Sequence, residues 1–241
     1  MRPSGPSTLL LTSTALICIW TSVLIPSVLM RNLILWLLLA FPGLANTAAA
    51  PAASSRPILV LGDSLSAAYH IAPESGWVAL LAHRLTQQNP QNPRRVVNAS
   101  ISGETSAGAL ARLPKLLAEN KPSLVLVELG GNDGLRGLAV EDIRGNLERI
   151  LKACRDANAK ILLIGIELPV NYGPQYRDGL RAMYRDVARE FNVPLVPFLL
   201  EGVASDPTLM QDDGLHPVAA AEPTVLDNVW PSIASIVSAL Q

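Results

Sequence analysis

The sequence predicts an α/β protein: a three-layer α/β/α flavodoxin-like sandwich with a five-stranded parallel sheet. Five short apolar blocks have the composition of buried parallel strands, and they span residues 58–61, 95–99, 124–129, 160–166 and 194–198. The segments between them carry apolar residues at helical spacing. Strands that alternate with amphipathic helices form right-handed βαβ units, which place a parallel sheet between two helical layers.

Each expected helix has a face of apolar residues. Residues 77–85 form one amphipathic segment. The faces of the next two segments consist of Leu110, Leu113 and Leu117, and of Ile143, Leu147, Ile150, Leu151 and Cys154. Residues 218–240 are expected to form a closing helix that Pro223 and Pro231 interrupt.

Residues 1–50 are expected to be an export segment, because no Asp or Glu occurs before Asp63. Residues 30–50 contain an arginine, an apolar run and small residues in the order of a secretory signal peptide. The uncharged apolar stretch at residues 9–29 is long enough to span a membrane. Since the signal-like segment is complete from Met30, we interpret residues 1–29 as a wrongly assigned extension. A retained amino-terminal anchor is the alternative.

Residues 51–241 are expected to form one domain. Cleavage after Ala45 or Ala50 leaves 196 or 191 residues, enough for one substantial core. That part has 17 basic and 20 acidic residues, a net charge of −3, which does not indicate a nucleic-acid partner. Its single cysteine, Cys154, lies on an apolar helical face, which favours a packing role. We expect a periplasmic or secreted monomer without a stable membrane span.

Four polar patches follow predicted strands or lie in the last loop. Their sequences are GDSL (62–65), SISGE (100–104), GGND (130–133) and DDGLHP (212–217). In a parallel sheet the connections after the strands emerge at one edge, where ligands of open α/β sheets bind. Each patch alone is typical of a turn or a helix cap. Together, at compatible places, they indicate an active site.

The patches contain the groups that a serine nucleophile requires. Ser64 could attack a carbonyl carbon, and His216 could take the hydroxyl proton and return it to the leaving group. Asp213 could hold the imidazole through Nδ1. The backbone N–H groups of Ser64 and Gly103 and the side-chain amide of Asn132 could form an oxyanion hole. A glycine at position 103 would let an acyl group approach the main chain.

The remaining histidines do not suggest further chemistry. His70 is expected at the rim of the site and His83 on the helix at 77–85, and neither is expected to be catalytic. A metal site lacks ligands, because no histidine or cysteine cluster accompanies His216. No phosphate-binding glycine motif follows a strand. We therefore expect no cofactor.

The four patches resemble the sequence blocks of the SGNH hydrolases, also called the GDSL family, and especially their bacterial thioesterase I, arylesterase and lysophospholipase branch. The similar blocks are GDSLSAAY, NASISGETSAGALARLP, VLVELGGNDGLRG and DDGLHP, and the likeness runs from about residue 57 to 217. The resemblance implies the SGNH hydrolase fold, with Ser64, Asp213 and His216 as the triad. It also implies an oxyanion hole of Ser64, Gly103 and Asn132. The Asp-x-x-His spacing selects Asp213 over Asp212.

Apolar residues beside the predicted site indicate an acyl-binding groove. The candidates are Leu135, Leu138, Leu168, Pro169 and Tyr172. Each buried CH₂ would contribute about 0.8 kcal/mol, so longer acyl chains should react better until the groove ends. Alternatively, these residues only cover the edge of the sheet. Glycines at positions 130, 131, 134 and 137 suggest a loop that closes over the substrate.

The leading interpretation is a serine esterase and thioesterase. Its substrates would be arylesters, acyl-CoA and lysophospholipid-type esters, hydrolysed through an acyl-serine intermediate. An acyltransferase or a carbohydrate acetylesterase would use the same triad. A non-catalytic lipid- or glycan-binding module would require an incomplete triad, whereas all three members are present.

Overall fold

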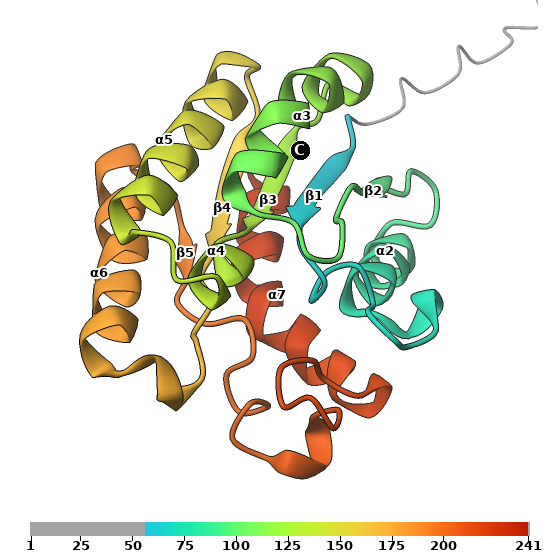
Figure 1. The fold of residues 1–241 in the computed structure, drawn as a ribbon. Coiled ribbons are helices and arrows are strands. Elements are labelled where there is room, and N and C mark those ends of the chain that lie inside the picture. Colours follow the sequence, from blue (N-terminus) through green and yellow to red (C-terminus); the bar gives the residue numbers. More distant parts are fainter. Residues whose placement is uncertain (1–55, 241) are drawn as a thin grey trace, which may run out of the picture. The chain divides into compact units, whose positions relative to one another are not determined.

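Five parallel strands form the central sheet, in the order β2-β1-β3-β4-β5 (Figure 1). The computed structural model describes residues 56–240, and the predicted export segment lies outside them. The strands are β1 (Ile58–Gly62), β2 (Val96–Asn98), β3 (Leu124–Glu128), β4 (Lys160–Ile164) and β5 (Leu195–Val196). The predicted five-stranded parallel sheet is confirmed. β5 is shorter than predicted, since the flanking Pro194 and Pro197 have no N–H to donate to a sheet.

Helices cover both faces of the sheet, as the three-layer prediction requires. On one face lie α2 (Trp77–Gln88) and α7 (Glu222–Ser238), and on the other lie α3 (Ser106–Asn120), α5 (Val140–Asp156) and α6 (Pro174–Phe191) (Figure 1). Side chains of each strand alternate between the two cores. In β1, Ile58 and Val60 pack toward α2 and α7, whereas Leu59 and Leu61 pack toward the other layer. Burial on both faces explains why β1, β3 and β4 read as continuous apolar blocks.

The closing helix runs without a break, contrary to the expected interruption by prolines. Pro223 lies in the first turn of α7, where a backbone N–H has no intrahelical partner to lose. Pro231 lies inside the helix, as Pro114 does in α3. Val225, Leu226, Val229 and Ile233 of α7 are buried against the sheet. Burial of this apolar face therefore outweighs the missing hydrogen bond.

The central strands end at the same level and so deliver their loops to one edge. Gly62 of β1 is in register with Glu128 of β3, which is in register with Ile164 of β4. The short helix α4 (Gly131–Leu135) lies directly after β3. Single 3-10 turns complete the chain: η1 (Pro73–Ser75), η2 (Val170–Tyr172), η3 (Pro207–Leu209) and η4 (Ala219–Ala221). Across the described range, none of the helices has the length and apolar character needed to cross a membrane.

Candidate active site

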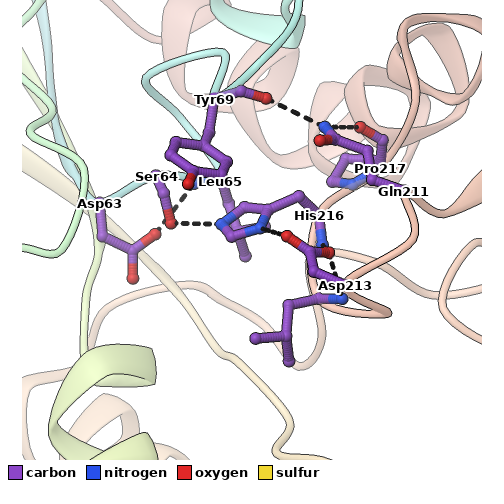
Figure 2. A network of polar contacts seen from close by, with 9 residues as sticks. Asp63, Ser64, Leu65, Tyr69, Gln211, Asp213, His216 and Pro217 are labelled. Carbon is purple, nitrogen blue, oxygen red and sulfur yellow. Dashed lines mark hydrogen bonds and ion pairs between the residues drawn. The ribbon is translucent and has the colours of Figure 1, made fainter.

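Ser64, His216 and Asp213 form a hydrogen-bonded chain at this edge of the sheet (Figure 2). The Oγ of Ser64 lies 2.7 Å from Nε2 of His216. On the other side of the ring, Nδ1 of His216 lies 2.7 Å from Oδ2 of Asp213. These distances allow proton transfer from the hydroxyl to the imidazole while the carboxylate fixes the ring. The structure thus brings the predicted triad residues together.

A tight loop places His216 and Asp213. Oδ1 of Asp213 accepts the backbone N–H groups of Leu215 and His216, so one carboxylate oxygen shapes the loop and the other binds the imidazole. Gly214 has a φ of 63°, a conformation that favours glycine. Although partial burial raises it, the hydrogen bonds from Leu215 and His216 bring the pKa of Asp213 below its ordinary value. The carboxylate is therefore ionised at neutral pH.

Gln211 ties this loop to the segment that carries Ser64. Its Nε2 donates to the backbone oxygens of Tyr69 and Pro217, as Figure 2 shows.

The ring of Tyr69 lies against the His216 imidazole, with centroids 4.4 Å apart, and stacks on the exposed ring of His70 at 3.8 Å. Tyr69 packs against the imidazole and limits its rotation, and it was not among the predicted site residues. His70 is exposed beside Tyr69 and is not part of the cavity lining, and the side chain of His83 is exposed on α2.

The residues of the three predicted oxyanion donors, one of which is the triad serine itself, line one cavity of about 420 Å³ together with His216. Ser64 follows β1, Gly103 follows β2 and Asn132 lies in α4. Gly103 has a φ of 80° and open space around the position of a Cβ, so backbone conformation, more than close packing, favours glycine there. Its backbone oxygen accepts a hydrogen bond from Nη2 of Arg136 at 3.0 Å.

Two buried carboxyl groups lie behind the nucleophile, and neither was among the predicted site residues. Asp63 accepts the N–H of Leu65 on Oδ1 and Nδ2 of Asn132 on Oδ2, each at 3.0 Å. Glu128 is fully buried, and its Oε2 accepts from Oγ of Ser66 at 2.7 Å and from the N–H of Asp63 at 3.2 Å. The sequence signal that could have predicted a role for Glu128 is a glutamate at the end of an otherwise apolar strand.

Burial shifts the titration of this carboxyl pair. Loss of hydration raises the pKa of Asp63 to about 6, against the lowering effect of its hydrogen bonds and of His216. Burial and the neighbouring charge of Asp63 raise the pKa of Glu128 well above its ordinary value. Burial therefore favours the neutral form of Glu128, whereas Asp63, with its pKa of about 6, is ionised at neutral pH.

A third buried carboxylate joins two of the loops that carry oxyanion donors. Asp133, next to Asn132, accepts hydrogen bonds from the backbone N–H and the hydroxyl of Ser106 at the start of α3. Asn146 of α5 donates to the same hydroxyl. Because Gly103 lies three residues before Ser106, this network holds the Gly103 loop against α4.

Apolar side chains line the cavity beside Ser64. They are Leu65, Leu135, Ile166, Leu168, Pro169, Phe198, Leu200 and Leu215. Three of the predicted groove residues are thus present, but Leu138 and Tyr172 are not in this lining. Leu138 is 39% exposed beyond α4, and the hydroxyl of Tyr172 donates to the backbone oxygen of Leu135 at 2.9 Å, which supports that segment. Phe198 and Leu200 were missed because they follow β5, far along the chain.

Glycines around α4 permit close packing, which the hypothesis of a mobile loop did not anticipate. A Cβ at Gly134 would lie 2.7 Å from the side chain of Leu168. At Gly130, with a φ of 115°, a Cβ would clash with the hydroxyl of Tyr184. Close packing in and beside this short helix therefore explains why glycine occupies both positions.

Cys154 lies on the buried face of α5 and is completely buried. Burial raises the pKa of its thiol to about 12, so the nucleophilic thiolate is absent at neutral pH. The predicted packing role of Cys154 is confirmed.

The comparisons with known proteins agree on the family and fold of this chain. A model of the GDSL-like Lipase/Acylhydrolase family matches residues 60–222. Esterase TesA of Pseudomonas aeruginosa is 52% identical over 181 residues, which cover 75% of this chain and 89% of that protein. Thioesterase 1/protease 1/lysophospholipase L1 of Escherichia coli K12 is 48% identical over 176 residues, 73% of this chain and 82% of the relative.

Solved structures of similar sequence have the same fold. The crystal structure of TesA has a TM-score of 0.71 at 53% identity and covers 73% of this chain and 97% of that one. The psychrotrophic esterase EstA from Pseudoalteromonas sp., inhibited by monoethylphosphonate, also has a TM-score of 0.71, at 42% identity, with 76% of this chain and 99% of that chain covered.

Proposed function

This chain belongs to the GDSL-like lipase/acylhydrolase family, and we propose that it is a serine esterase and thioesterase acting through an acyl-serine intermediate. The observation that carries the proposal is the continuous chain from Oγ of Ser64 through His216 to Asp213, which opens into an apolar cavity. The names of the relatives, which include an esterase, a thioesterase and lysophospholipase, and an arylesterase, support the same class.

In the first half of the proposed reaction, Ser64 is acylated. Its Oγ attacks the carbonyl carbon of the ester or thioester as Nε2 of His216 takes the hydroxyl proton. The charge that develops on the carbonyl oxygen is stabilised by the N–H groups of Ser64 and Gly103 and by Nδ2 of Asn132. Collapse of the tetrahedral intermediate breaks the bond to the leaving alcohol or thiol, which receives the proton from the imidazolium.

Water then releases the acyl group. Nε2 of His216 takes a proton from the attacking water, and the same donors stabilise the second oxyanion. When this intermediate collapses, the carboxylic acid leaves and the proton returns to Oγ of Ser64. Throughout, the ionised Asp213 stabilises the imidazolium and keeps Nε2 directed at Ser64.

The cavity favours substrates with an apolar acyl part. Its lining is formed mainly by aliphatic side chains together with Phe198, and it begins directly beside Ser64. Each CH₂ buried there would add about 0.8 kcal/mol of transition-state binding. Arylesters, acyl-CoA and lysophospholipid-type esters all present an acyl group of this kind, and we infer that they are the substrate class.

Replacement of Ser64 tests the mechanism. We expect Ser64→Ala to lose turnover of p-nitrophenyl and acyl-CoA esters, and a fluorophosphonate to label the native chain at Ser64 only. Unchanged turnover in the variant would refute the mechanism. Product analysis with added acceptor alcohols separates hydrolysis from acyl transfer. A sharp preference for C2 esters would favour a carbohydrate acetylesterase over an enzyme with an acyl-binding groove.

We infer from the sequence pattern of residues 30–50 that the enzyme is exported and acts in the periplasm or outside the cell, and we propose separately that it is a monomer. Mass spectrometry of the natural amino terminus tests the export segment, and light scattering of the mature chain tests the oligomeric state. A mature chain that still contains residues 9–29 would contradict this inference.

A further inference from the structure

A buried carboxylate joins the nucleophile turn to the loop of Asn132. Asp63 immediately precedes Ser64 and is 2% exposed. Its two oxygens are divided between Leu65, which belongs to the nucleophile turn, and Nδ2 of Asn132. A Cβ at Gly131 would lie 3.1 Å from Oδ2 of Asp63, so the first turn of α4 packs directly against the carboxylate.

The chemistry of this contact decides which end of the Asn132 amide faces Asp63. An ionised carboxylate can only accept hydrogen bonds, whereas an amide has a donor end and an acceptor end. Asp63 therefore selects Nδ2. Among residues 56–240 the second N–H of Nδ2 has no other partner, and Asn132 lines the cavity. An amide turned by 180° would present its oxygen, which repels an oxyanion.

Glu128 holds Asp63 from behind. Its Oε2 accepts the N–H of Asp63 and the hydroxyl of Ser66, which places both ends of the turn around Ser64. The fit is tight, because a Cβ at Gly62 would lie 2.6 Å from Oε2 of Glu128. Within the described chain, the buried Oε1 has no hydrogen-bond partner, which suits a protonated, neutral carboxyl beside the ionised Asp63.

We propose that Asp63, supported by Glu128, is a positioning residue that orients the Asn132 amide as an oxyanion donor. This inference rests on the proposed function, because it assigns Asn132 a role in the same reaction. Asp63 does not touch the reacting atoms in this role. Its contribution appears in kcat only as long as Asn132 is present.

A double-mutant cycle tests the coupling. We expect Asp63→Asn to lower kcat for p-nitrophenyl butyrate by roughly 100-fold with little change in KM, close to the loss for Asn132→Ala itself. In the Asn132→Ala background, Asp63→Asn should change kcat by no more than about twofold, since the amide that it orients is gone. Equal losses in both backgrounds, or wild-type kcat in Asp63→Asn, would overturn the proposal.

Asp206 provides a matched control. Its Oδ1 accepts the N–H of Thr208 at 2.9 Å, the same turn contact that Asp63 makes with Leu65, but Asp206 is only partly buried and lies outside the cavity. Asp206→Asn should leave kcat unchanged. An inactive Ser64→Ala combined with an additive cycle would reject the positioning role alone, whereas an active Ser64→Ala would reject the proposed function.

A measurement on the native chain covers the case in which Asp63→Asn does not fold. The Nδ2 proton resonances of Asn132, assigned by their absence in Asn132→Ala, should shift as Asp63 titrates with its pKa of about 6. The same titration in His216→Gln removes the contribution of the imidazole. Resonances that stay constant in His216→Gln would overturn the proposed contact.

Discussion

The carboxylate of Asp213 divides its two oxygens between structure and catalysis: Oδ2 lies 2.7 Å from Nδ1 of His216, while Oδ1 accepts two backbone N–H groups of the same loop. A carboxylate in this arrangement selects the imidazole tautomer with the proton on Nδ1. Nε2 is then free to accept the proton of Ser64. The loop and the base are thus oriented by one side chain.

Replacing this carboxylate by an amide should separate its two roles. Asp213→Asn retains an Oδ1 that can accept the loop N–H groups, so the melting temperature should change little. The amide disfavours the required imidazole tautomer, and we expect kcat to fall by about 10⁴-fold. Stopped-flow or steady-state assays with p-nitrophenyl esters measure the loss. Asp212→Asn, on the exposed neighbour, serves as the control, and equal activity of the two variants would contradict the assignment.

The protonation of Glu128 leads to a second prediction. If Glu128 is neutral, Glu128→Gln keeps a neutral acceptor for the N–H of Asp63, and kcat at pH 8 should stay within a few-fold of wild type. Glu128→Ala leaves that N–H and the Ser66 hydroxyl without an acceptor, which costs about 1–3 kcal/mol of stability for each unsatisfied group. Thermal unfolding and ester assays measure both variants. A Glu128→Gln enzyme as impaired as Glu128→Ala would show that the charge is needed.

The packing of Gly134 against Leu168 offers control of the cavity width. In Gly134→Ala the new methyl group would displace the Leu168 side chain, which lines the cavity. We expect kcat/KM to fall more for C12 than for C2 esters, because a longer acyl chain needs more of the groove. Gly145→Ala is the matched control, since a Cβ there meets nothing within 4 Å. A uniform loss over all chain lengths would argue against an acyl groove at Leu168.

Glu222 should make the stability of the fold depend on pH. Its buried carboxylate accepts the N–H of Trp77 at 2.7 Å, and burial raises its pKa to about 7. The native state therefore retains a proton that the unfolded chain releases near pH 4.5. Glu222 therefore contributes on the order of 3 kcal/mol to the free energy of unfolding. This contribution is fully present below pH 4.5 and is lost as the pH rises through about 7.

Urea unfolding at pH 5 and pH 8 measures this effect. Glu222→Gln keeps an acceptor for Trp77 and should lose part of the difference in free energy of unfolding between the two pH values. Glu119→Gln, on the exposed surface of α3, should retain the full difference. An unchanged pH dependence in Glu222→Gln would mean that this group titrates normally.

Local patterns accounted for most of the fold. Strands β1, β3 and β4 are buried on both faces and so read as apolar blocks, and α2, α3 and α5 show their buried faces at regular spacing, which predicted the layers and the parallel sheet. α7 was the exception. Its prolines predicted an interruption, but burial of residues such as Val229 against the sheet keeps the helix continuous, and that burial depends on contacts distant in sequence.

The sequence by itself determined which residues could supply a nucleophile, a base and an oxyanion hole, because these groups stand in short motifs after strands. Only the tertiary structure decided what surrounds them. The link from Asp63 to Asn132 crosses 69 residues, and the cavity wall combines Leu168 with Phe198 while excluding Leu138 and Tyr172. Such contacts depend on how the strands are ordered and on which side chains turn inward, and no local pattern carries that information.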